Sequence, residues 1–97
     1  MAYDPGAIDA TLAAAVGDEP GLIADLREAF LESATRCFAN MQNAQSEHGW
    51  RDAALRMKGL AASFGAVRLM TMASEAAERP VGDIETMRAL RAAITRL

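Results

Sequence analysis

The sequence predicts an all-α protein, an antiparallel up-down four-helix bundle with a short N-terminal lid helix. Alanine, leucine and methionine dominate the chain, while the β-branched and aromatic residues that favour strands are sparse. Glycine and proline, which interrupt helices, occur at only a few places. Short connections between long helices make neighbouring helices antiparallel. We therefore expect residues 1–97 to form one helical domain.

Glycine and proline set the ends of the first two predicted helices. Gly17, Pro20 and Gly21 separate a short first helix from a long second one, and Pro20 suits the first turn of that second helix. Its predicted cap is Asp18 or Glu19, because either carboxylate can accept hydrogen bonds from free first-turn amides.

Three further breaks separate the remaining helices. The pair His48–Gly49 is predicted to end the long helix, and Gly65 to separate the third helix from the fourth. The segment from Arg79 to Gly82 separates the fourth helix from the fifth, which Asp83 is predicted to cap. The five helices are thus expected near residues 6–16, 20–46, 50–64, 66–79 and 83–96.

The last four predicted helices each carry an apolar stripe with helical period, and these stripes predict the core. On the long helix and the third helix the stripes are Leu22, Leu26, Phe30, Cys37, Met41, Ala44, Trp50, Ala53, Ala54, Met57, Leu60, Ala61 and Phe64. On the last two helices they are Ala66, Leu69, Met70, Ala73, Ala77, Ile84, Met87, Leu90, Ile94 and Leu97.

Composition argues against several classes of function. A formal net charge of -3 gives no bulk attraction to nucleic acid or to anionic lipid. No apolar stretch approaches the roughly 18 to 20 residues that cross a bilayer, and residues 1–5 lack the basic and then apolar run of a secretory signal. We therefore expect a cytoplasmic, monomeric protein that binds neither nucleic acid nor membrane.

The third predicted helix carries the most informative motif. It reads Leu55-Arg56-Met57-Lys58-Gly59-Leu60-Ala61 and is followed by Gly65-Ala66. This segment resembles the signature helix of histidine-containing phosphotransfer (HPt) domains, which reads His-x-Leu-Lys-Gly-x-Ala followed by Gly-Ala. Leu55 stands where that family has its phospho-accepting histidine. The resemblance implies a protein of bacterial two-component phosphorelay signalling whose partner is a response-regulator receiver domain or a sensor histidine kinase.

Leu55 removes the chemistry that the resemblance would otherwise imply. The family's histidine attacks a phosphoaspartate through a ring-nitrogen lone pair, and a leucine side chain offers no nucleophile. The family's lysine, here Lys58, supplies positive charge for phosphoryl oxygens, and the glycine, here Gly59, leaves room for close approach. We therefore expect a non-phosphorylatable docking module, without enzymatic activity, that competes with or scaffolds an active phosphotransfer protein.

The predicted docking surface comprises Leu55, Lys58, Gly59, Ala62, Ser63, Leu31 and Phe38. At about 100° per residue, Leu55 falls roughly 160° from the centre of the apolar stripe and is predicted to face solvent. Gly59 costs about 0.5 to 1 kcal/mol relative to alanine inside a helix, so its presence needs a reason. Tight packing against a neighbouring helix is one reason, but the outward position favours access by a partner. An apolar patch is expected to continue from Leu55 onto the long helix.

Other interpretations stay open. A phosphotransfer protein could use another acceptor, but His48, the only histidine, is predicted to end the long helix about 10 Å of helical rise from the Lys58–Gly59 surface. Leu55 could also be a neutral replacement in a decayed module, or the chain a plain helical interaction bundle unrelated to phosphorelay. Cys37 is expected to be a small buried hydrophobe. No phosphate loop, metal-ligand cluster or activated nucleophile is evident, so no cofactor or metal is expected.

Overall fold

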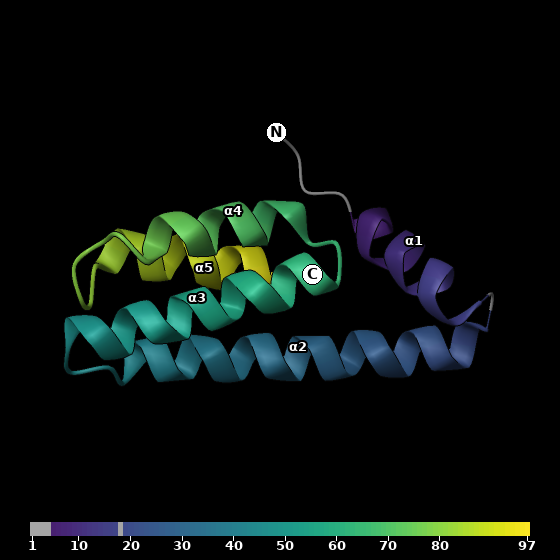
Figure 1. Ribbon diagram of the computed structural model, residues 1–97, viewed down its shortest axis with the longest axis horizontal. Coiled ribbons are helices and arrows are strands. Elements are labelled where there is room, and N and C mark those ends of the chain that lie inside the picture. Colours follow the sequence, from purple (N-terminus) through teal and green to yellow (C-terminus); the bar gives the residue numbers. More distant parts are fainter. Residues whose placement is uncertain (1–4, 18) are drawn as a thin grey trace.

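The computed structural model describes residues 5–17 and 19–97, and within them the chain is all-helical, without strands. These residues form five helices: α1 (Pro5–Val16), α2 (Pro20–Gln42), α3 (Glu47–Ser63), α4 (Val67–Ala76) and α5 (Ile84–Thr95). From α2 to α5 the chain reverses direction at each connection, and α1 lies at one end against the start of α2 (Figure 1). Contacts join α2 to α3, α3 to α4, α4 to α5 and α5 back to α2. The molecule measures 42 × 24 × 17 Å.

The connection between α2 and α3 differs from the prediction. Instead of running to Ser46, α2 ends at Gln42, and α3 begins at Glu47 rather than at Trp50. The Ser46 side chain caps α3, because its Oγ accepts a hydrogen bond from the backbone N–H of Gly49 at 3.0 Å. Gly49 is thus part of the first turn of α3 and not a break.

The other helix ends follow simple backbone chemistry. Asp83 caps α5 as predicted, since its Oδ2 accepts a hydrogen bond from the Thr86 N–H at 3.1 Å. The Thr86 hydroxyl donates to the same oxygen, and this bond, together with the backbone one, lowers the pKa of the Asp83 carboxyl. The fourth helix ends at Ala76, before the predicted Arg79. Beyond it, the backbone N–H groups of Glu78 and Arg79 donate to the carbonyls of Glu75 and Ala76, three residues back, in tighter turns than those of an α-helix.

At the start of α2, Pro20 occupies the first turn as predicted. The side chain of Glu19 stands at the cap position but makes no capping hydrogen bond. The alternative cap, Asp18, lies outside the described residues.

The Gly65-Ala66 pair of the motif ends α3. Gly65 has a φ of 74°, a left-handed conformation that glycine adopts without steric cost. The Ala66 N–H donates to the Ala61 carbonyl at 2.9 Å, and the Gly65 N–H donates to the Ala62 carbonyl at 3.3 Å. This pair of hydrogen bonds is the Schellman ending of a helix, so Gly65-Ala66 has a structural role that does not depend on phosphotransfer.

Most of the predicted core is buried, and Trp50 lies within it. The Trp50 side chain is 1% exposed, and its indole N–H donates to the Ala76 carbonyl at 2.8 Å. The rings of Phe30 and Phe64 stack with centroids 4.8 Å apart. The first helix adds Ile8 and Leu12, both buried. Ala34, Phe38, Ala76 and Ala93 are also buried, although they fall outside the predicted stripes.

Two residues assigned to the core are exposed instead, and eight others, Cys37 among them, are only partly buried. Leu22 is 41% exposed in the first turn of α2, which projects beyond α3 toward α1 (Figure 1). Ile84 is 69% exposed at the first position of α5, where few neighbouring side chains can cover it. Cys37 is partly buried at the margin of the core. Within the described ranges, no helix combines the length and apolarity needed to cross a bilayer.

Candidate functional site

The outward side of α3 carries Leu55 in the middle of the helix. Leu55 is 39% exposed, which confirms its predicted outward orientation, and Gly59 and Ala62 are exposed on the same side. The opposite side of α3 packs into the core through residues such as Met57 and Ala61, both fully buried. Leu55, Gly59 and Ala62 therefore form a stripe of low polarity along α3, called the α3 stripe below.

Gly59 is not required by packing inside the molecule. A Cβ built on Gly59 would meet no atom of a neighbouring element within 4 Å. This open space excludes tight packing against another helix as the reason for the glycine. The Ser63 hydroxyl donates to the Gly59 carbonyl at 3.0 Å, so this hydroxyl is held along its own helix. Gly59 therefore leaves a shallow, uncovered place beside Leu55.

Replacement of Gly59 by alanine is expected to stabilise the fold by about 0.5 to 1 kcal/mol, because alanine restricts the unfolded chain and meets no clash here. Urea unfolding followed by far-UV circular dichroism measures the change. Ala62→Gly is the matched control on the same exposed stripe and should shift stability in the opposite direction. A loss of stability in Gly59→Ala would show that the glycine is needed for packing.

Basic side chains flank the α3 stripe on both sides. Arg51 contacts Glu78, which follows α4, at 2.7 Å, and Lys58 lies about two turns further along the same side of α3. On the other side, Arg56 and Arg36 lie close enough to Cys37 for their charges to act on its thiol. Burial, the larger effect, raises the pKa of that thiol, and the two cations oppose the rise.

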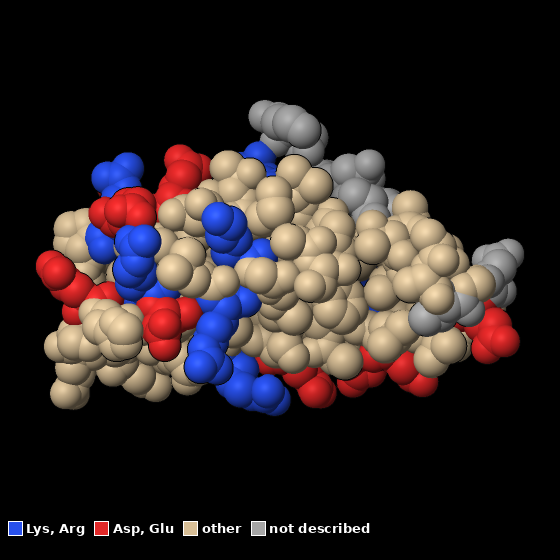
Figure 2. All heavy atoms as spheres, in the orientation of Figure 1, with Lys and Arg blue, Asp and Glu red and all other residues tan. Residues whose placement is uncertain are grey.

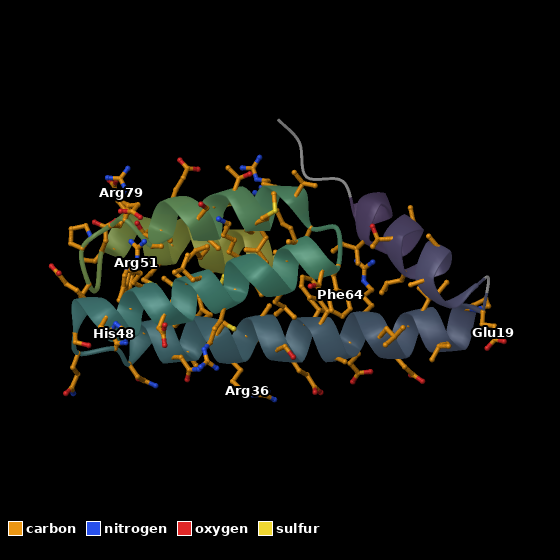
Figure 3. The ribbon with its side chains drawn as sticks, in the orientation of Figure 1. Glu19, Arg36, His48, Arg51, Phe64 and Arg79 are labelled. Carbon is orange, nitrogen blue, oxygen red and sulfur yellow. The ribbon has the colours of Figure 1, made fainter. Side chains whose placement is uncertain are left out.

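The flanking charges form part of a wider basic band. Figure 2 shows basic side chains crossing the face that presents α3 and α2, and Figure 3 places Arg36 at the α2 edge of that face. A broad uncharged area extends from the band toward α1 (Figure 2). Acidic side chains lie on the same face beside the band and along its lower edge (Figure 2), so the positive charge is local to the band.

Leu31 and Phe38 do not belong to this surface, contrary to the prediction. Phe38 is only 9% exposed, and the Arg91 guanidinium of α5 lies over its ring, 5.3 Å from the centroid. Leu31 lies about two turns before Phe38 on the same side of α2, whereas Cys37 faces α3. The long helix thus turns Leu31 and Phe38 toward α5. The apolar patch expected to join them to Leu55 is not formed.

His48 also lies elsewhere than predicted. It is exposed in the first turn of α3 and not at the end of α2 (Figure 3). Because it precedes Leu55 by about two turns, it projects from nearly the same side of α3 at about 10 Å of helical rise. Among the described residues, no group of three or more His, Cys, Asp and Glu side chains could hold a metal ion.

The motif alone did not identify the full set of flanking cations. Arg56 follows Leu55 directly, so a helical wheel could have placed it on one flank. Arg36 comes from another helix, and only the packing of α2 against α3 brings it to the same surface. Comparison with protein-family models, curated proteins and solved structures found no match for this chain. The likeness to HPt domains is therefore carried by the motif residues of α3.

Proposed function

We propose that the chain is an HPt-like four-helix bundle, formed by α2 to α5 with α1 as its lid, that lacks a phospho-acceptor and docks onto signalling domains. Its partner is a response-regulator receiver domain or a sensor histidine kinase of bacterial two-component signalling. The observation that carries the proposal is the exposed Leu55 beside an uncovered Gly59, at the positions that the HPt motif reserves for its histidine and its small residue.

The charges around the α3 stripe support this partner class. A receiver that presents an aspartyl phosphate brings negative charge to the contact, and Lys58 and Arg56 stand on the two flanks of Leu55. Complementary charges raise the rate of encounter and fix its orientation more than they raise affinity. Leu55 would then occupy the place of the attacking imidazole, and the phosphoryl group would stay on the aspartate, because no lone pair is offered. Bound in this way, the chain blocks the same receiver from an active phosphotransfer protein.

Leu55→Glu is expected to weaken binding to a phosphorylated receiver domain by tenfold or more, on the order of 1.4 kcal/mol, because it places a carboxylate opposite the phosphoryl group. The fold should be unaffected, since the side chain points outward. Binding is measured by isothermal titration with purified receivers of the native cell, and stability by thermal unfolding. Such encounters are often small, burying less than about 1,200 Å².

Leu22→Glu is the matched control for this test. Leu22 is an exposed leucine of nearly equal accessibility, 41% against 39%, in the first turn of α2 beyond the basic band. The Leu22→Glu substitution should leave receiver binding unchanged. If Leu55→Glu binds the receiver as strongly as the parent chain does, the receiver contact lies elsewhere on the molecule. Stoichiometric phosphohistidine at His48 would favour a phosphotransfer protein with another acceptor, and absence of any receiver or kinase binding would favour a plain interaction bundle.

A further inference from the structure

A second surface lies between α2 and α5. Two cavities of about 340 and 330 Å³ open there, and they share Phe38, Gln42 and Arg91 in their walls. Because the walls are shared, the two cavities form one groove, called the α2–α5 groove below. It extends from Ile84 at the start of α5 to Thr95 at its end, a helix of 12 residues or about 18 Å.

The α2–α5 groove has an apolar floor and a basic rim. The floor is formed by Phe38, Met87 and Ile94, and Ile84, 69% exposed, stands at one end. Arg88 and Arg91 are both exposed along the rim. Among the described residues that line the two cavities, none is acidic. The groove thus combines apolar surface with positive charge.

We propose that the α2–α5 groove binds an acidic amphipathic helix of a partner protein. Aliphatic side chains spaced along one face of such a helix would cover Ile84 and fill the apolar floor, as in other helix-in-groove contacts. Carboxylates on its flanks would meet Arg88 and Arg91, and an arginine can bind a carboxylate with two parallel hydrogen bonds. The length of the groove matches about 12 residues of helix. The apolar floor gives little to a sugar-phosphate backbone, so a peptide fits better than a nucleic acid.

This binding surface is separate from the one proposed above. The α3 stripe and its flanking Arg56 lie on the side of α2 that carries Cys37, whereas Phe38 and Arg91 lie on the side that faces α5. The two partners could therefore be bound at the same time. Such a chain would hold an acidic helix close to a signalling domain and would act as a scaffold as well as a competitor.

The test uses a synthetic, fluorescently labelled peptide of about 16 residues, long enough to form a helix. Leucines recur on one face at helical spacing and glutamates occupy the flanks. The same peptide with lysines in place of glutamates is the control ligand. Fluorescence anisotropy with the full chain should show saturable binding of the acidic peptide only, and the affinity should fall as salt is raised. No saturation up to about 1 mM, the limit of a weak contact, or equal binding of the basic peptide would overturn the proposal.

Variants locate the contact within the groove. Arg88→Glu combined with Arg91→Glu should weaken acidic-peptide binding by about tenfold or more, since two attractions become repulsions. Ile84→Ala should weaken it at every salt concentration, because it removes apolar contact and no charge. Arg96→Glu changes an exposed arginine at the C-cap of α5, outside both cavities; it is the matched control and should bind like the parent chain.

Three results would contradict this assignment. Equal loss in Arg96→Glu would mean that only overall charge matters. If the double variant unfolds through loss of the Arg91–Phe38 contact, Arg88→Glu alone and Ile84→Ala decide the question, and unchanged binding in both overturns it. A dimer in sedimentation that Ile84→Ala abolishes would assign the groove to a second copy of the chain. All these variants should still bind the receiver domain. A negative result with the acidic peptide can therefore be distinguished from a failure of the proposed receiver docking.

Discussion

Leu55→His is expected to become phosphorylated when it is mixed with a phosphorylated receiver domain that binds the parent chain. The new imidazole would stand exposed in the middle of α3, beside the uncovered Gly59 and with Lys58 on its flank. A histidine titrates near neutral pH, so a useful fraction is unprotonated and nucleophilic. Docking would hold the aspartyl phosphate within reach, and such positioning supplies much of the rate advantage of a bound reaction.

The label should be stable in alkali and labile in acid, as expected of phosphohistidine, and mass spectrometry should place it at position 55. The parent chain should remain unlabelled under the same conditions. Leu22→His, which adds an equally exposed histidine outside the α3 stripe, is the matched control and should also remain unlabelled. If a receiver binds Leu55→His and no label forms, the surroundings of Lys58 and Gly59 do not support transfer. The resemblance to HPt domains would then reflect fold and ancestry only.

Trp50→Ala should lower the free energy of unfolding by about 3 to 5 kcal/mol, the largest loss expected from a single core substitution here. The side chain is 1% exposed, and its removal leaves a large cavity between α3 and α4. A domain of this size has about 5 to 15 kcal/mol in total, so the variant would be close to unfolding at physiological temperature. Urea unfolding followed by far-UV circular dichroism measures the loss.

Trp50→Phe separates packing from hydrogen bonding at the same position. It keeps an aromatic ring but removes the N–H that binds the Ala76 carbonyl. That carbonyl also accepts the Arg79 N–H at 3.0 Å, so it is not left unpaired. We expect a loss of about 1 to 2 kcal/mol, well below that of Trp50→Ala. Equal losses in the two variants would show that the hydrogen bond, and not the volume, dominates.

The sequence predicted the helical class and most of the core because both depend on local pattern. Trp50, Met57 and Leu90 fall on stripes of helical period, and each is buried. The α2–α3 connection was misplaced for a local reason as well. Gly49 was interpreted as a break, although a serine three residues earlier can cap a helix that contains the glycine, and the residues from Asn43 to Gln45 include no glycine or proline.

The candidate site was predictable only within one helix. The outward orientation of Leu55 and Gly59 follows from their spacing along α3. The placement of Leu31 and Phe38 depends on which neighbour each side of α2 meets, and a helical wheel of α2 does not contain that information. The α2–α5 groove is hidden from the sequence for the same reason, because Phe38 and Arg91 come from distant segments that only tertiary packing brings together.

The first half of α3 is attached to the end of α4 at two consecutive residues. Trp50 binds the Ala76 carbonyl from inside the molecule, and Arg51 contacts Glu78 from outside. A rotation of α3 about its axis, or a slide along it, would break both contacts together. The direction in which Leu55 points is therefore set before any partner arrives. Docking on such a surface orders little additional backbone. The entropic cost of binding therefore comes mainly from interface side chains that lose freedom. The lifetime of the complex then depends on the contacts that these side chains make.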